Sequence, residues 1–170
     1  MPQKVVAHFI DHTIVKGTSV DVDPGKPRCH IRTETGVLEV DLSQLKALYF
    51  VKDLSGRPEY SEQRAAQDGD SRLRGSHAVK LTFMDGEPLH ALMNRFPPNR
   101  PFYFVLPIDA ESNNERILVN RDAVVAVEAV DLSAMREPKP DEDSGKPKIG
   151  RTSWVFDGKG IREVDGNPPR

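Results

Sequence analysis

Two matching stretches decide the fold of this chain: Val79-Lys80-Leu81-Thr82-Phe83-Met84-Asp85-Gly86 and, 74 residues earlier, Val5-Val6-Ala7-His8-Phe9-Ile10-Asp11-His12. Their alternating side chains are typical of a β-strand with one apolar face, and both stretches end in a turn signal. At the same offset, Pro24 aligns with Pro98, Lys26 with Arg100 and Pro27 with Pro101. The chain therefore contains an internal repeat.

Each copy of the repeat has the same succession of short apolar segments. We predict strands at 4–11, 13–20, 28–32, 37–41 and 46–51, and again at 79–84, 87–93, 102–106, 116–119 and 124–130. A single helical turn is predicted before each last strand, at 41–45 and 120–123. Pro88 predicts an edge or a strand start, because proline cannot donate to a sheet ladder. This is the plan of a small SH3-like or Sm-like barrel.

The expected fold is all-β, with two tandem five-stranded SH3-like/Sm-like barrels at 1–55 and 76–131. Units of this size are marginal alone, so the two copies should pack together, and the outward Val6 and Ile10 are candidates for that contact. Between them, 56–75 is a polar linker with a turn of helix around 62–66.

The C-terminal segment has a different composition. We expect 132–170 to be mostly disordered, because 136–150 is rich in Pro, Lys and Asp. The segments 153–156 and 160–164 flank Asp157-Gly158 and contain the only tryptophan of the chain, Trp154. They indicate a short hairpin or docking segment, with a frayed end that folds back onto a barrel as the alternative.

Composition narrows the functional classes. The 170 residues carry a net charge of −2 and a mean hydropathy of −0.53, so the chain lacks a global attraction to nucleic acid or anionic lipid. No apolar run reaches the length of a membrane helix, and no apolar signal region precedes the first strand. The single cysteine, Cys29, allows no internal disulfide. These features favour the cytoplasm.

The familiar catalytic motifs are missing from the sequence. There is no Gly-rich phosphate loop after a strand and no Gly-x-Ser-x-Gly turn. His8, His12, Cys29 and His30 do not have the spacing of a zinc motif. We therefore predict a non-enzymatic protein without cofactor or metal, which acts by binding.

Ten polar residues are candidates for contacts with a ligand or partner. Lys26 and Arg100, which lie in equivalent loops, would make a pair of cations if the barrels are related by pseudo-symmetry. Others follow the fifth strand, where they would clamp the linker onto the first barrel or mark a groove between the barrels. The run 112–116 presents amide and guanidinium groups, although such a loop also satisfies its own backbone. The candidates are Lys26, Arg28, Arg32, Lys52, Asp53, Tyr60, Arg100, Asn113, Asn114 and Arg116.

Nucleic-acid binding is one alternative function, because Sm-like barrels often bind RNA. It requires local positive charge beside exposed aromatic rings. Residues 1–55 contain seven Lys/Arg against seven Asp/Glu, and 76–131 contain five against eight. This balance disfavours phosphate binding.

A second alternative comes from a short motif. Arg28-Cys29-His30-Ile31-Arg32 has the Arg-x-x-x-Arg spacing of the PilZ domain, and Asp53-Leu54-Ser55-Gly56 is similar to the start of its Asp-x-Ser-x-x-Gly motif. The resemblance implies a receptor for cyclic di-GMP. The chain departs from the pattern because its arginines lie on a predicted internal strand and Pro58 replaces the glycine.

The broadest resemblance covers about residues 4–131. Lys4-Val5-Val6-Ala7-His8-Phe9, Glu39-Val40-Asp41-Leu42, Tyr49-Phe50-Val51-Lys52-Asp53 and Ser112-Asn113-Asn114-Glu115-Arg116-Ile117 are similar to a bacterial family of uncharacterised proteins with tandem copies of this unit. The resemblance implies a fold and a bacterial origin, and no activity. Our leading expectation is a regulatory adaptor that engages a protein, or a small nucleotide-like ligand, between its barrels.

Overall fold

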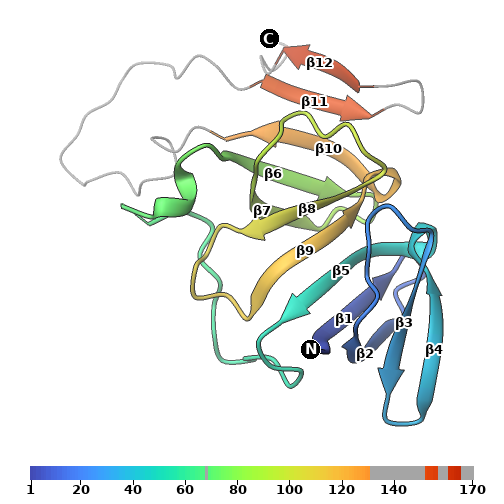
Figure 1. The fold of residues 1–170 in the computed structure, drawn as a ribbon. Helices are drawn as coiled ribbons and strands as arrows, with labels where there is room; N and C mark the ends of the chain where they lie inside the picture. Colours follow the sequence, from blue (N-terminus) through green and yellow to red (C-terminus); the bar gives the residue numbers. More distant parts are fainter. Residues whose placement is uncertain (68, 131–151, 157–160, 166–170) are drawn as a thin grey trace.

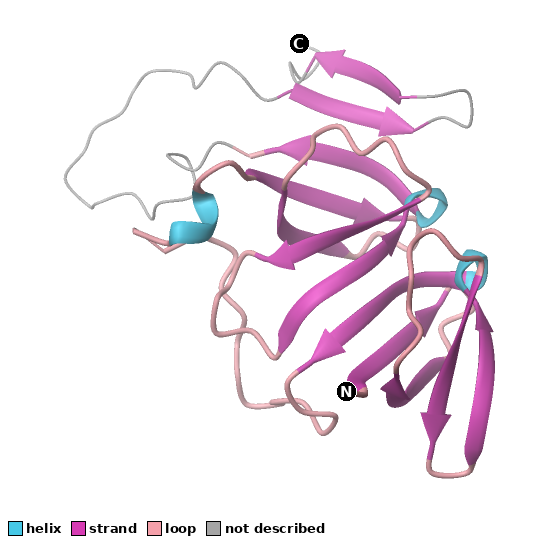
Figure 2. Ribbon diagram, in the orientation of Figure 1, coloured by secondary structure: helices cyan, strands magenta, loops and turns pink. Residues whose placement is uncertain are grey.

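Strands dominate the computed structural model of this chain, which describes residues 1–67, 69–130, 152–156 and 161–165 (Figures 1 and 2). The helices of these residues are single turns, and none has the length and apolar content needed to span a membrane. The disorder expected at 136–150 lies outside the described residues.

The two repeats contain the same ten strands that their sequences predict, with ends within two residues of the predicted ones. The expected helical turn at 62–66 is irregular chain instead, and a turn forms at η2. The elements are β1 (Gln3–Phe9), β2 (Ile14–Ser19), β3 (Arg28–Thr33), β4 (Gly36–Asp41), η1 (Leu42–Gln44), β5 (Leu45–Val51), η2 (Ser71–Leu73), β6 (His77–Phe83), β7 (Pro88–Met93), β8 (Phe102–Pro107), β9 (Asn114–Asn120), η3 (Arg121–Ala123), β10 (Val124–Ala129), β11 (Thr152–Phe156) and β12 (Ile161–Asp165).

Strand pairing repeats between the copies residue for residue. The orders are β5-β1-β2-β3-β4 and β10-β6-β7-β8-β9. Val5 stands opposite Phe50, and its counterpart Val79 stands opposite Ala129. First strands therefore correspond at an offset of 74 residues and fifth strands at an offset of 79. The five extra residues lie in the loop between β8 and β9, which is longer than the loop between β3 and β4.

The expected pair of closed barrels is not what the strands form. In each repeat the fifth strand pairs with the first but not with the fourth, so each five-stranded unit stays open. At the junction, β5 pairs with β9 of the other repeat, and the strands join in one sheet that runs from β12 to β4. The open edge of one repeat is thus satisfied by the other, which removes the need for each barrel to close on itself.

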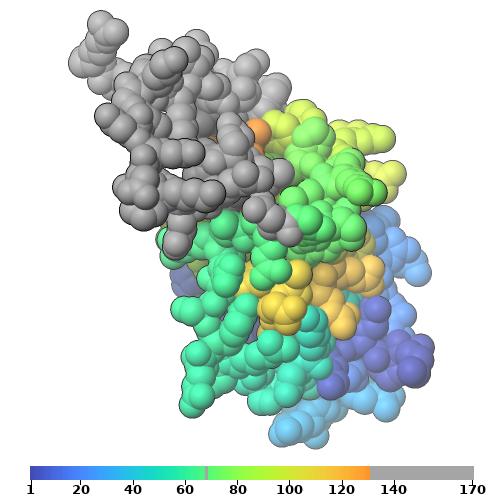
Figure 3. Space-filling view, turned by 90° about the vertical axis from the view of Figure 1, so that its left-hand side faces the viewer, coloured from blue at the N-terminus to red at the C-terminus, as the bar shows by residue number. Residues whose placement is uncertain are grey.

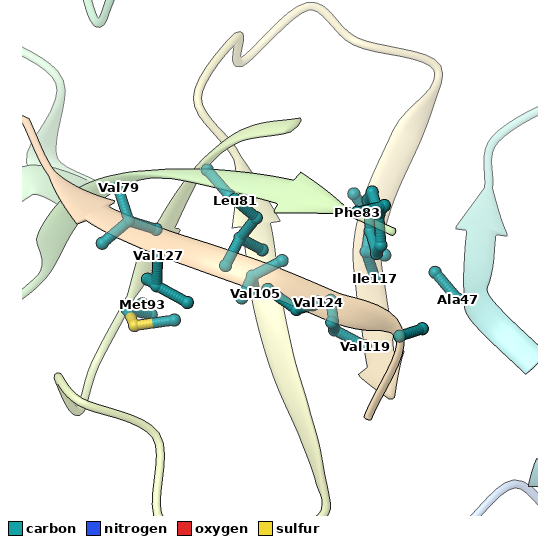
Figure 4. Close-up of a cluster of buried hydrophobic side chains, with 12 residues drawn as sticks. Ala47, Val79, Leu81, Phe83, Met93, Val105, Ile117, Val119, Val124 and Val127 are labelled. Carbon is teal, nitrogen blue, oxygen red and sulfur yellow. The ribbon is translucent and has the colours of Figure 1, made fainter. Parts of the chain in front are cut away.

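The two hydrophobic cores share the strands at this junction. Ala47 of β5 belongs to the core of the second repeat (Figure 4). Tyr49 packs against the same core. In return, Leu118 of β9 belongs to the core of the first repeat, and Phe102 and Phe104 pack against it. Because neighbouring residues of a strand face opposite sides, β5 and β9 serve both cores at once. The expected packing of the copies therefore occurs by exchange of side chains.

The surface predicted to join the copies, around Val6 and Ile10, contributes little to this junction. Val6 is buried within its own repeat, and Ile10 is 38% exposed.

A buried ion pair also crosses the junction. Lys46 occupies the bulge of β5, and its side chain is only 7% exposed. Its Nζ lies 2.8 Å from Asp85 Oδ2, bonds to Glu87, and sits 4.7 Å from the centre of the Phe83 ring. These contacts hold the turn between β6 and β7 against the first repeat.

Candidate binding groove on the first repeat

The linker after β5 is fastened to the second repeat by polar contacts. Arg57 Nη1 donates to the Glu111 carbonyl at 3.0 Å, and the Tyr60 hydroxyl donates to Asp109 Oδ2 at 2.7 Å. The Gln63 N–H donates to the same carboxylate oxygen at 2.8 Å. Figure 3 shows the linker, coloured teal to green, spread over this face of the molecule. Tyr60 therefore clamps the linker to the second repeat, and not to the first as expected.

The carboxylate at the centre of this clamp is Asp109, which is 3% exposed. Burial opposes its ionisation, but hydrogen bonds from Gln63, Tyr60 and the Glu111 N–H outweigh burial and hold the pKa of Asp109 below its usual value. The hydrogen bond between Tyr60 and Asp109 raises the pKa of Tyr60 to about 12. A charged Asp109, in the loop between β8 and β9, therefore holds the linker against the second repeat.

The clamped linker covers one end of the second repeat. Residues 60–64 lie across the start of β7 and the end of β8, and the cavity left between them is about 350 Å³. Pro88, Leu89, His90 and Pro107 line it from the sheet side. This end of the second repeat is thus largely occupied by the chain itself.

The same end of the first repeat is open. Ile14, Val15, Lys16 and Thr33, which correspond to those four residues at the offset of 74, line a groove of about 910 Å³. We call it the first-repeat groove; its remaining lining comes from Gly17 and Thr18 of β2, the 32–38 part of the β3–β4 hairpin, Leu54 and Ser55. The first-repeat groove is therefore open, whereas the linker covers the corresponding place on the second repeat.

The groove is lined by exposed aliphatic side chains, by the cations Lys16 and Arg32 and by the acidic Glu34. Ile14 is 53% exposed and Leu38 is 42% exposed. Lys16 Nζ donates to the Leu54 carbonyl at 3.3 Å, and Arg32 forms no ion pair or hydrogen bond through its side chain with any described residue. Exposed aliphatic side chains gathered in one concave place indicate a contact surface.

Local backbone geometry opens this groove. β2 and β3 pair only at Thr18 and Arg32. At Gly17, an added Cβ would lie 2.2 Å from the Arg32 carbonyl oxygen, so only glycine permits this close approach. Beyond this point the two strands diverge, and the groove lies between them.

A free strand edge runs beside the groove. β4 is the last strand of the sheet, so its outer edge has no partner strand among the described residues. Its counterpart β9 has the same edge paired with β5. An unpaired edge next to an apolar groove can accept an extended polypeptide.

Charged groups lie near the β4 edge, on β3, β4 and the loop before β3. Arg28 Nη1 is 3.1 Å from Glu39 Oε1. His30 Nδ1 is 2.6 Å from Asp21 Oδ2, and its Nε2 is 3.5 Å from Glu39. The bond to His30 lowers the pKa of Asp21 to about 2, and the same bond raises the pKa of His30. The charge of Arg28 is therefore engaged within the chain.

Several predicted site residues meet at the junction of the repeats. The Asp53 N–H donates to Asn113 Oδ1 at 3.1 Å, and Asn113 Nδ2 donates to the Asp53 carbonyl at 2.9 Å. The Lys52 N–H donates to the Asn113 carbonyl at 2.8 Å. The Asn114 N–H bonds to the Ser112 hydroxyl at 3.0 Å. These contacts fasten the chain after β5 to the loop before β9.

Arg116 lies at the same junction. Its guanidinium carbon is 4.3 Å from the ring centre of Phe50 and 4.7 Å from that of Phe104, and its Nη2 donates to Gln3 at 2.9 Å. Stacked on two rings, it contributes to the joint between the repeats.

The two cations of the equivalent loops, Lys26 and Arg100, are not joined by any contact of the described residues. Their side chains make no hydrogen bond or ion pair there. Arg100 lines a separate cavity of about 350 Å³ on the second repeat, together with Arg95 and Tyr103.

Cys29 and the histidines form no metal centre in the described part of the chain, where no group of three or more metal-ligating side chains converges. Cys29 is fully buried, and burial raises its pKa to about 11. It packs in the first core.

The residues that matter most in this geometry were not among the predicted ones. Ile14 and Leu38 line the groove. Lys46 forms the buried ion pair at the junction, and Asp109 binds the linker. The extra length of the loop containing Asp109, relative to the first copy, was the available signal.

A comparison with protein families places residues 1–131 in a family described as "Family of unknown function (DUF6982)". The match spans both repeats, and the chain belongs to this family. Neither the curated proteins nor the solved structures contain a match.

Proposed function

We propose that this family member is a non-enzymatic adaptor of the bacterial cytoplasm that binds an extended segment of a partner protein in the first-repeat groove. One observation carries the proposal: on the second repeat, this chain's own linker covers the place that corresponds to the groove, and its own β5 pairs with β9, the counterpart of β4. These segments of the second repeat therefore serve as the guide to the kind of segment that a partner would place on the first repeat.

The partner segment adds to the sheet as a strand beside β4. Backbone hydrogen bonds to the free edge supply affinity, and alternate side chains enter the groove. In the second repeat, Ala47 and Tyr49 of β5 are the residues that face the core from this position. A partner with small and aromatic side chains two residues apart therefore matches the strand that this position accepts in the second repeat.

The walls of the groove add a charge preference. Lys16 and Arg32 give its lining two cations against one carboxylate, that of Glu34. An acidic residue at an end of the partner segment would meet these cations, which favours correct partners and the register of binding more than raw affinity.

A synthetic peptide with the sequence of residues 44–52, which contains β5, tests the proposal. We expect the labelled peptide to bind the full chain in fluorescence anisotropy and to slow hydrogen exchange at the β4 amides. Leu38→Glu should abolish binding, because it replaces an exposed aliphatic side chain of the groove with a carboxylate. Val125→Glu is the matched control, since Val125 is also 42% exposed but lies on β10. Equal binding by both variants, or protection away from β4, would overturn the proposal.

Protein binding is favoured over cyclic di-GMP sensing by the state of the arginines. Arg28 is paired with Glu39, and both Arg28 and Arg32 belong to β3 inside the sheet. A di-anionic ligand would have to displace that ion pair.

A specific observation supports nucleic-acid binding as the second candidate. The Tyr103 hydroxyl is buried without a hydrogen-bond partner among the described residues, and it borders the cavity that contains Arg95 and Arg100. If this cavity takes a phosphate, the full chain binds single-stranded RNA with an affinity that falls with salt, and Arg100→Ala reduces both affinity and salt dependence. Binding unaffected by Arg100→Ala would exclude this site.

A further inference from the structure

The C-terminal strand β11 occupies on β10 the place that β9 occupies on β5. On β5, Leu48 stands opposite Leu118 and Ala47 opposite Val119. Their counterparts on β10, Val127 and Ala126 at the offset of 79, stand opposite Trp154 and Val155. Both pairs are antiparallel, and the same two positions of the fifth strand are paired in each.

The match extends to the next strand. β12 pairs antiparallel with β11, as β8 pairs antiparallel with β9, although β12 follows β11 in the chain whereas β8 precedes β9. The hairpin β11–β12 therefore stands where the β8–β9 hairpin of a following repeat would stand (Figure 1). It ends the series of repeats at the β10 edge.

The two ends of the series are complementary. Each fifth strand accepts an antiparallel neighbour on its outer edge: β5 accepts β9, and β10 accepts β11. β4 corresponds to β9, yet its outer edge is free among the described strands. Without the hairpin, β10 would expose the edge that corresponds to the outer edge of β5. In the molecule, the outer edge of β5 pairs with β9, which is the counterpart of β4.

We propose that β4 of one copy pairs with β10 of a second copy when the β11–β12 hairpin is released, and that the hairpin is a plug that prevents this assembly. The proposal rests on the proposed function in one respect, because it requires β4 to accept a strand. The internal junction sets the register: Ala126 opposite Val40, Val127 opposite Glu39 and Glu128 opposite Leu38, the second residue of each pair from the second copy.

Charge and topology fit this arrangement. Glu128 corresponds to Tyr49, which faces the neighbouring repeat, so its carboxylate would approach the groove of the second copy, whose charged lining is Lys16, Arg32 and Glu34. Pairing of β10 with β4 is head-to-tail and leaves both outer ends available, so it produces rings or filaments and not a closed two-fold dimer. A tethered plug competes well with a free copy, because its effective concentration is high.

Full-length variants test the plug. In the released chain, Trp154→Pro and Val164→Pro break both strands of the hairpin, because proline cannot donate to a ladder. In the locked chain, Glu128→Cys and Ser153→Cys place two thiols opposite each other for a disulfide between β10 and β11. Sedimentation velocity should show growing, concentration-dependent oligomers for the released chain, and monomer for the locked chain.

Two substitutions in the released chain test the register. Leu38→Glu places a carboxylate opposite Glu128 of the second copy and should restore the monomer. Leu38→Lys is the matched control, and it should preserve the oligomers because the opposed charges attract. Equal behaviour of the two variants would overturn the register, and hence the proposal.

The released chain also separates the two proposals. If hydrogen exchange shows that the β10 amides are exposed and the chain stays monomeric, the plug proposal fails. Should the peptide of residues 44–52 still bind that chain, the first-repeat groove survives as a partner site. If the released chain neither forms oligomers nor binds the peptide, the proposal that the groove binds a partner fails as well.

Discussion

The ammonium nitrogen of Lys46 lies 2.8 Å from Oδ2 of Asp85, and this contact joins the last strand of the first repeat to the first turn of the second. With 7% of the Lys46 side chain exposed, the charge depends on its carboxylate partners. The double variant Asp85→Ala and Glu87→Ala leaves an unpaired buried ammonium and should cost about 3 kcal/mol in the free energy of unfolding, measured in urea. Lys46→Met is the control: it removes the charge together with the need for a partner and should cost much less. A Lys46→Met variant as unstable as the double variant would contradict this account.

Acid should loosen the linker clamp through Asp109. Its pKa is lower in the folded chain than the value of about 3.9 expected when unfolded. Ionised Asp109 therefore stabilises the fold above the unfolded pKa, and this contribution is lost as pH falls through the folded pKa. The difference in unfolding free energy between the natural chain and Asp109→Asn should be largest near neutral pH and shrink below about pH 4. Urea titrations at several pH values measure it, and a constant difference would argue against the charged clamp.

The close approach at Gly17 should not tolerate a methyl group. Its Cβ would lie 2.2 Å from the Arg32 carbonyl oxygen and 2.7 Å from Ile31 Cγ2. Gly17→Ala should cost about 1–3 kcal/mol and lower the melting temperature, because strands must move apart. Gly25→Ala, whose new Cβ meets nothing closer than 3.3 Å, is the comparison and should be far milder. Equal melting temperatures for the two variants would show that β2 and β3 separate easily.

His30 should titrate above its usual pKa of 6.5, because Asp21 bonds to its protonated ring. Asp21→Asn should bring the His30 pKa back toward 6.5, whereas Asp23→Asn should leave it unchanged. NMR titration of the ring protons measures both. If Asp21→Asn has no effect, Glu39 is the group that holds the proton on His30.

The strands could be predicted from the sequence, because alternation and turn residues are local signals. Pro88 does begin β7, and the helical turns before β5 and β10 are present. The pairing of β5 with β9 could not be predicted in the same way. It depends on which edges remain open after each repeat folds, and on side chains such as Leu118 that serve the other repeat's core.

The candidate site was harder to predict for a related reason. Cations spaced along a strand carry no information about their partners, and Arg28 is paired with Glu39 across a hairpin. The groove at Ile14 and Leu38 is recognisable only when the linker is known to cover one repeat and not the other. In the sequence, Asp109 is one acidic residue of a polar loop, and only the fold shows that Tyr60 and Gln63 donate hydrogen bonds to it.

The exchange of side chains at the junction has a consequence for how the chain folds during synthesis. The first repeat is made first, but its core includes Leu118 and is contacted by Phe102 and Phe104. Until those residues leave the ribosome, Leu48 and Phe50 on β5 lack part of their apolar cover. The N-terminal half therefore reaches its final packing only after most of the second half has emerged, so the two halves should gain and lose their structure in a single cooperative transition.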